Sequence, residues 1–392
     1  MSTVKNHILP TIVIAQFCCT SLWFVGNSIN SELIDTFRLN SSALGDLTTS
    51  VQFGFIMGTF LYAFLTITDL FSPSKVFFIS AIVAAGFNSL IVLPSNTLAS
   101  LITLRFFTGF FLAGIYPVGM KIASDYFKKG LGKSLGFLIG ALVLGTAFPH
   151  FVKGYESLAS WKFMIYMTSS LATFGGLIML VLIPDGPYKK KQQQFNPSIF
   201  YDVFKGENFR KGAFGYFGHM WELYAFWAFL PVLLKAYVLN HNIENFNIAM
   251  ISFIVIGFGC LGCVCSGYLS QIFTPKKVAA TSLLLSGVCC LLSPLFFLID
   301  SEFLFIVFLI FWGIVVIADS PLFSTIIAKN VLPEHRGTAL TIVNCFGFAI
   351  TIISIQLLNY LQNLVAIEYL FVLLAIGPVF GVFSLLKNNQ RA

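Results

Sequence analysis

The chain has 392 residues, of which 57% are hydrophobic and only 10% are charged, and its mean hydropathy is +0.87. Soluble domains carry about 25% charged residues, so this chain cannot cover a water-facing surface. The composition therefore excludes an ordinary soluble protein, and the net charge of +7 is better explained by membrane topology than by binding to nucleic acid.

Apolar runs of roughly twenty residues recur along the chain, the length that an α-helix needs to cross a hydrocarbon core of ~30 Å. They predict an all-α membrane protein with twelve transmembrane helices. The first run is expected to be retained, because no small-residue cleavage site follows it. The predicted spans are 7–29, 44–67, 76–94, 99–124, 134–152, 162–184, 213–235, 247–270, 278–299, 303–328, 337–360 and 366–386.

Lysine and arginine residues concentrate in the two termini and in every second connection between spans. Only Arg38, Lys153, Lys162 and Lys235 fall in the connections on the other side. This asymmetry follows the positive-inside rule and predicts that both termini are cytoplasmic. We therefore expect a multi-pass protein of the cell (inner) membrane, monomeric, whose partners are bilayer lipids and a small-molecule substrate.

The longest polar stretch, residues 185–212, follows six spans and precedes six more, as a cytoplasmic linker would. It separates an N-terminal half, 1–184, from a C-terminal half, 213–392. The segment Asp69–Val76 after span two is matched 202 positions later by Gln271–Val278 after span eight. Phe, Pro, Lys and Val recur in register and Ser is matched by Thr, which indicates an internal duplication.

The six-plus-six arrangement, the basic central linker and the paired turns resemble the major facilitator superfamily. In the turn after span two, Asp69 and Lys75 match that family's motif, and Leu104-Arg105 with Gly109 is similar to its membrane-embedded arginine motif. The resemblance implies two six-helix bundles, secondary transport of a small solute by alternating access, and a central cavity lined by spans one, four, seven and ten.

Three charged side chains lie in the middle of predicted spans: Arg105 in span four, Glu222 in span seven and Asp319 in span ten. Each is expensive to insert, about 2.5–3.5 kcal/mol by insertion scales. His219 precedes Glu222 by one helical turn and shares its face. We predict that Glu222, Asp319 and His219 couple transport to protons, because burial favours a neutral carboxyl and a nearby cation favours the anion. The alternative is that each charge belongs to a fixed ion pair or is capped by Ser or Thr hydroxyls.

Five residues are candidates for substrate binding. Gln16, Trp23 and Asn27 are spaced by seven and four residues, which places them on one side of an unbroken helix in span one. Tyr224 is an aromatic candidate in span seven. An arginine is always charged and needs partners. Arg105 is therefore either a cavity-facing group that binds an anion or relays a proton, or a structural charge that is hydrogen-bonded to neighbouring helices.

The family resemblance implies a cytoplasmic gate. It assigns to Asp69 the role of holding the cytoplasmic side shut by pairing with a helix end or a basic residue, with Asp125, at the end of span four, as its neighbour across the turn. The alternative is a pair of solvated loop carboxylates.

Other function classes fit the sequence less well. The five histidines are scattered over both membrane faces and the middle, which argues against a polytopic membrane enzyme. A passive channel or facilitator is disfavoured by the two-fold repeat and by the lack of a selectivity-ring motif. We expect no enzyme activity, cofactor or metal, and we expect the eight cysteines to serve as small packing residues in apolar spans.

Overall fold

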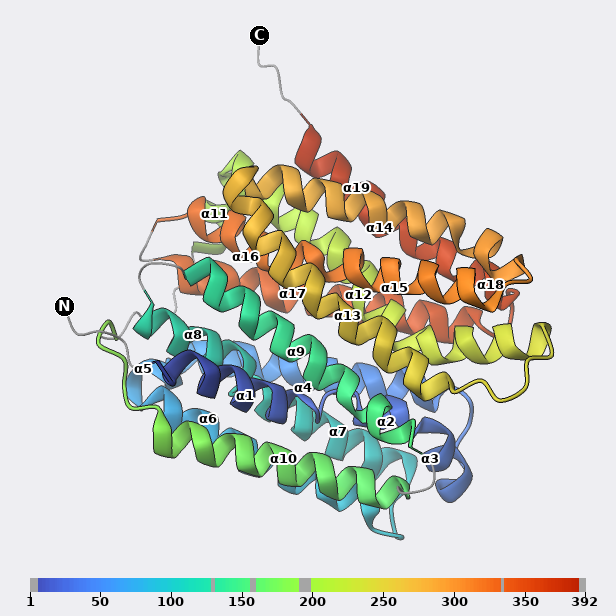
Figure 1. The fold of residues 1–392 in the computed structure, drawn as a ribbon. Helices are drawn as coiled ribbons and strands as arrows, with labels where there is room; N and C mark the ends of the chain where they lie inside the picture. Colours follow the sequence, from blue (N-terminus) through green and yellow to red (C-terminus); the bar gives the residue numbers. More distant parts are fainter. Residues whose placement is uncertain (1–5, 128–130, 156–159, 190–198, 333–334, 388–392) are drawn as a thin grey trace. The chain divides into compact units, whose positions relative to one another are not determined.

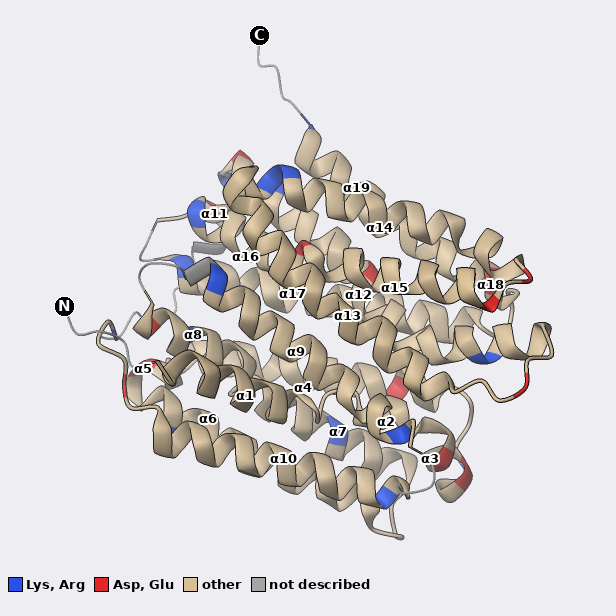
Figure 2. Cartoon of the chain, viewed as in Figure 1, with Lys and Arg blue, Asp and Glu red and all other residues tan. Residues whose placement is uncertain are grey.

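The structure is a computed structural model, which describes residues 6–127, 131–155, 160–189, 199–332 and 335–387. All the regular elements in these residues are helices (Figure 1). Within the described residues, eleven helical segments are long and apolar enough to cross a membrane, and a twelfth apolar helix, Ile8–Thr20, is shorter. The prediction of an all-α membrane protein is confirmed. Charged residues lie mostly near the ends of helices (Figure 2).

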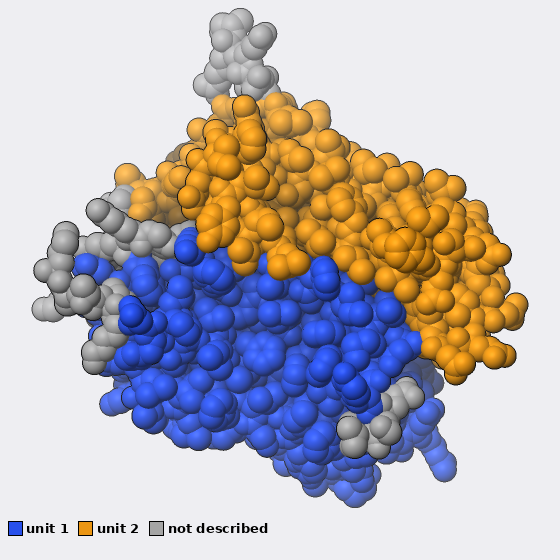
Figure 3. Space-filling model, in the orientation of Figure 1, with its two compact units in different colours: residues 1–195, 247–260 blue, residues 196–246, 261–392 orange. Residues whose placement is uncertain are grey.

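The chain divides into two compact units, coloured separately in Figure 3. Unit 1 comprises Met1–Phe195 and Asn247–Cys260, and unit 2 comprises Asn196–Phe246 and Leu261–Ala392. The first part of the eighth predicted span thus belongs to unit 1, where Phe253 contacts the ring of Phe151 at 4.9 Å and Asn247 donates to the Gly154 carbonyl at 2.7 Å. The middle of the predicted linker, 190–198, lies outside the described residues.

In unit 1, the most extensive pairings are those of α4 with α7, α6 with α10, and α1 with α10 and α9. Glycines allow α4 and α7 to touch through their backbones. A Cβ at Gly54 would lie 1.9 Å from the Phe106 carbonyl oxygen, and one at Gly109 would lie 2.0 Å from that of Val51. The helices of this unit are α1 (Ile8–Thr20), α2 (Val25–Ser28), α3 (Asn30–Phe37), α4 (Ala43–Phe64), α5 (Ile67–Leu70), α6 (Pro73–Ser89), η1 (Leu90–Val92), α7 (Leu98–Leu112), α8 (Tyr116–Tyr126), α9 (Leu131–Lys153) and α10 (Trp161–Leu182).

In unit 2, the long helix α12 packs on α19 and α17. Its Gly218 meets Gly377 so closely that a Cβ on either residue would lie 2.3 Å from the carbonyl oxygen of the other. The helices are α11 (Ile199–Lys205), α12 (Glu207–Asn240), α13 (Ile248–Ile272, which crosses the unit boundary), α14 (Pro275–Leu298), α15 (Glu302–Ala318), α16 (Ser320–Lys329), α17 (Arg336–Leu361), α18 (Ile367–Leu370), η3 (Phe371–Ala375) and α19 (Ile376–Leu386).

Three predicted spans are broken where the sequence predicts one helix. Span one ends as α1 at Thr20 and resumes as α2 at Val25. Span four is interrupted between α7 and α8. Span ten is interrupted between α15 and α16, which are separated by the single residue Asp319. A proline lies at the first or second position of both α8 and α16, where its missing N–H costs no helical hydrogen bond. The breaks therefore fall in the spans that also carry the embedded polar residues.

Candidate functional site

Glu222 lies on α12 and is 1% exposed. Its Oε1 accepts hydrogen bonds from Trp312 Nε1 at 2.7 Å, from Cys290 Sγ at 3.3 Å and from the Ser286 hydroxyl. These donors come from α14 and α15, so three helices of unit 2 meet at one carboxyl oxygen. Among the described residues, Oε2 has no hydrogen-bond partner and no cation forms an ion pair with Glu222. All three donors are neutral side chains.

A second buried group lies on the same helix, as the i, i+3 spacing predicts. His219 Nδ1 and Asp319 Oδ1 are 2.8 Å apart, with both side chains at most 1% exposed. The contact has the distance of an ion pair but not the angles of a hydrogen bond. The rings of His219, Tyr216 and Phe323 contact one another, with centroids 6.0 Å apart for His219 and Tyr216, 5.9 Å for His219 and Phe323, and 6.2 Å for Tyr216 and Phe323. Asp319 occupies the break in span ten, so the pair joins α12 to that break.

Arg105, on α7, is 1% exposed and contacts the break in span one. Its Nη1 donates to the Leu22 carbonyl at 3.1 Å and to Asn88 Oδ1 at 3.3 Å, and its Nη2 donates to the Trp23 carbonyl at 2.5 Å. These carbonyls belong to the turn between α1 and α2. No carboxylate pairs with Arg105 in the part of the chain that the structure describes. Its contacts correspond to the structural one of the two alternatives raised above.

The three candidates in span one do not lie on one regular helix, because α1 ends before Trp23 and Asn27. Gln16 is fully buried, and both atoms of its amide lack a hydrogen-bond partner among the described residues. Trp23 packs on Phe55, with ring centroids 4.9 Å apart. Asn27 Nδ2 donates to Thr48 Oγ1 at 2.9 Å. The geometry predicted from the seven- and four-residue spacing is therefore wrong, although all three side chains are buried.

Tyr224 lies on α12 and is 3% exposed. Its ring contacts that of Trp227 at 5.4 Å on the same helix and that of Phe348 on α17 at 5.3 Å. It is thus part of an aromatic cluster within unit 2.

Asp69 and Asp125 are brought together by a lysine. Lys121 Nζ lies 3.1 Å from Asp69 Oδ1 and 3.7 Å from Asp125 Oδ2. Asp69 lies on α5, while Lys121 and Asp125 lie one turn apart on α8. The sequence analysis placed both carboxylates here but missed the bridging lysine, which the i, i+4 spacing of residues 121 and 125 indicates.

The start of the linker packs against the same end of unit 1. Asp185 accepts hydrogen bonds from Ser72 at 2.7 Å and from Lys189 at 2.9 Å, and the Tyr188 N–H donates to the Asp125 carbonyl at 3.0 Å. Partial burial of Asp185 acts to raise its pKa, but the hydrogen bonds from Lys189 and Ser72 outweigh it and lower the pKa below its usual value. Asp185 is therefore held as an anion at the same end of unit 1 as Asp69 and Asp125.

The partners of Glu222 are side chains of the candidate site that the sequence analysis did not name. Cys290 was treated as a packing residue, and Ser286 and Trp312 were not singled out. A signal exists for two of them: Ser286 and Cys290 are spaced i, i+4, which places them on one face of the predicted span 278–299. No group of three or more His, Cys, Asp or Glu side chains that could hold a metal ion occurs in the described segments.

Broken helices with buried polar groups at or against the breaks are typical of secondary transporters. The family model described as "Major Facilitator Superfamily" matches residues 12–355, so the chain belongs to this superfamily of secondary transporters. Its fold is that of two six-helix bundles, and such proteins carry small molecules and are generally not enzymes. The resemblance predicted from the sequence is confirmed.

Solved structures of transporters share this fold. A bacterial homolog of the human lysosomal transporter Spinster, inward-facing and unoccupied, superimposes with a TM-score of 0.71 at 13% identity, covering 97% of this chain and 96% of the other. A point mutant of the nucleoside transporter NupG gives 0.71 at 14% identity, covering 96% of this chain and 98% of the other. At these identities the likeness concerns the fold alone. A search of curated proteins finds no match to the chain.

Proposed function

We propose that this chain is a proton-coupled transporter of a small polar solute and that Glu222 is the group that binds the coupling proton. The observation that carries the proposal is the fully buried Glu222 carboxyl, which meets three neutral donors and no cation among the described residues. A carboxylate buried without a cation costs several kcal/mol, whereas a protonated one is neutral. A change in the surroundings of this carboxyl during alternating access would therefore be linked to proton uptake and release.

Asp319 and His219 form the second element of the proposed coupling. His219 Nδ1 and Asp319 Oδ1 are 2.8 Å apart, so a charged imidazole and a charged carboxylate compensate each other here without an external counter-ion. Because His219 and Glu222 lie one turn apart on α12, a movement of this helix affects both groups. In the proposed coupling, Glu222 binds the proton, and the movement of α12 that accompanies binding changes the contact between His219 and Asp319.

The proposed solute is polar because buried polar side chains without partners lose hydrogen-bonding free energy, about 1–3 kcal/mol per group, until something binds them. Gln16 offers a donor and an acceptor that have no hydrogen-bond partner among the described residues. We assign Gln16, Asn27, Trp23 and Tyr224 to the substrate site in a cavity lined by spans one, four, seven and ten. Arg105 is assigned to the support of that site, since its donors already contact span one.

We further propose that the protein is a monomer of the cell (inner) membrane with both termini cytoplasmic, as the distribution of Lys and Arg indicates. Asp69, Lys121 and Asp125 then lie at the cytoplasmic end of unit 1. Their ion pairs support the assignment of a cytoplasmic gate.

The transport proposal is tested with the purified full chain in liposomes. A thermal-shift screen of polar metabolites identifies a stabilising compound, which is then radiolabelled for counterflow. A secondary transporter transiently accumulates the label when the liposomes are preloaded with unlabelled compound. Equilibration without overshoot would indicate a channel, and chemical conversion of the label would indicate an enzyme. Either result would contradict the proposal.

A further inference from the structure

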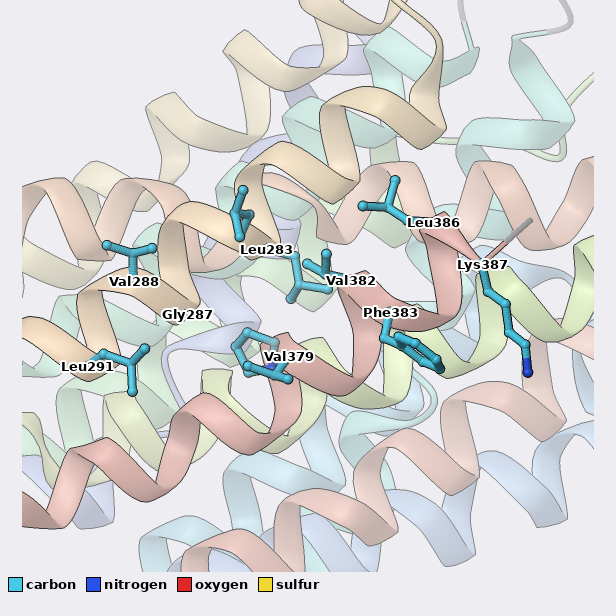
Figure 4. Close-up of a pocket in the computed structure, with 11 residues that line it drawn as sticks. Leu283, Gly287, Val288, Leu291, Val379, Val382, Phe383, Leu386 and Lys387 are labelled. Carbon is cyan, nitrogen blue, oxygen red and sulfur yellow. The ribbon is translucent and has the colours of Figure 1, made fainter. Parts of the chain in front are cut away.

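An apolar groove runs along the surface of unit 2 between α14 and α19, with a volume of about 500 Å³. Figure 4 shows that side chains of the two helices form its two sides and that Lys387 stands at one end. Every lining residue other than Lys387 is apolar. The lining residues Leu284, Val288, Leu291, Val379 and Phe383 are all between 42% and 64% exposed.

The groove exists because the helices approach closely at one level and carry large side chains elsewhere. A Cβ at Gly287 would lie 2.8 Å from Pro378 Cβ, and one at Gly381 would lie 2.5 Å from Leu283 Cδ2. These close contacts bring α14 and α19 side by side, and the groove is lined by Gly287 together with side chains of both helices. The lining residues of α14, 283–291, span ~12 Å along the helix axis, close to the ~15 Å depth of one leaflet's hydrocarbon.

Positive charges gather at one end of the groove. The pairs Gly287–Pro378 and Leu283–Gly381 define an antiparallel register, and continuing it for about a turn and a half brings Lys277 opposite Lys387. Both lysines are exposed, as is Lys276 beside them. Lys387 Nζ lies 5.9 Å from the centroid of the Phe383 ring, which lines the groove. The acyl-sized groove therefore ends in a cluster of exposed ammonium groups.

We propose that this groove is a binding site for an anionic phospholipid. One acyl chain lies between α14 and α19, and the headgroup phosphate meets Lys387 and Lys277. The apolar groove is about as long as one leaflet is deep, which suits an acyl chain, and the lysines at its end suit an anionic headgroup. A soluble partner would not match the exposed apolar length, because α14 and α19 are both membrane-spanning segments. Basic pockets at the cytoplasmic ends of helices select anionic headgroups, and this end of unit 2 is cytoplasmic in the proposed topology.

The test is native mass spectrometry of the purified full-length protein in detergent with added phosphatidylglycerol or phosphatidylcholine of identical chains. We expect one retained phosphatidylglycerol per monomer and preference for it over phosphatidylcholine. Lys277→Gln/Lys387→Gln should weaken retention about tenfold through the loss of two charges. Lys235→Gln/Lys329→Gln, which removes two exposed lysines elsewhere in the unit, should have no effect.

The apolar part of the site is tested by filling the groove. Val288→Trp should abolish retention, whereas Leu295→Trp, at an exposed position of α14 outside the groove, should not. Free glycerol phosphate should fail to compete with the lipid, since the acyl chain supplies most of the contact. Equal retention of the two lipids, unchanged retention in both the Val288→Trp and double-lysine variants, competition by glycerol phosphate, or a protein dimer that excludes lipid would each overturn the proposal.

Discussion

Arg105 shows how one residue links a sequence motif to local structure. The carbonyls of Leu22 and Trp23 lie in the turn between α1 and α2, and the guanidinium donates to both. Hydrogen bonds to a charged donor contribute about 1.5–3 kcal/mol each, and a buried carbonyl without a donor incurs a similar cost. The arginine thus stabilises the break in the span that carries Gln16 and Asn27.

Replacing Arg105 by Lys should destabilise the protein by about 2–4 kcal/mol, because an ammonium cannot reach both carbonyls and Asn88 in the geometry of the planar fork. Thermal unfolding in detergent and hydrogen exchange at residues 21–25 measure the effect. Arg38→Lys, at an exposed position of unit 1, is the control and should behave like the wild type. If Arg105→Lys left both stability and exchange unchanged, the bonds to the turn would not be stabilising.

At the scale of helices, close approach is set by glycines at particular levels. Gly54 on α4 leaves no space for a methyl group, since its Cβ would overlap the Phe106 carbonyl, whereas a Cβ at Gly86 on α6 meets no atom within 4 Å. Glycine pairs of this kind allow membrane helices to pack without the hydrophobic driving force that acts in water.

Gly54→Ala should therefore lower the free energy of unfolding by ~3 kcal/mol or more, because α4 and α7 must separate. Gly86→Ala makes a matched control: it should be neutral or stabilise by up to ~1 kcal/mol, as alanine is the better helix former. Thermal denaturation and the yield of monodisperse protein measure both variants. Similar stability of the two alanine variants would show that the backbone contact is not tight.

The sequence predicted the number and placement of the apolar segments well, because hydropathy reports directly on burial in lipid. The helix breaks were not predicted, because they are stabilised by residues far away in the chain, as Leu22 and Trp23 are by Arg105. Pro117 and Pro321 were usable local signals, since a proline favours the first turn of a new helix.

In the candidate site, too, local features could be predicted from the sequence and contacts between distant residues could not. The spacing of His219 and Glu222 on one helical face followed from periodicity alone. The contacts of Glu222 with Ser286, Cys290 and Trp312 depend on which faces of three helices meet, and that is set by packing rather than by local sequence.

At the scale of the whole molecule, the ion pairs of Lys121 are the element proposed to hold the cytoplasmic side closed. Lys121→Asp should leave three carboxylates together and reduce transport about tenfold, because like charges at this distance repel. The charge swap Asp69→Lys/Lys121→Asp should restore most of the transport, since it recreates an ion pair. Counterflow by each variant provides the measurement. If the swap were no better than the single variant, the gate assignment would be contradicted.

The account centres on Glu222 as the proton-binding group of a secondary transporter, and Glu222→Gln tests it most directly. Glutamine retains the size and the acceptor oxygen but cannot exchange a proton. In liposomes with an imposed pH gradient, wild-type protein should accumulate the solute above its equilibrium level. The variant should still exchange solute in counterflow but fail to accumulate it, while Glu302→Gln, on the first turn of α15, should match the wild type. Gradient-driven accumulation by Glu222→Gln at the wild-type level would contradict the account.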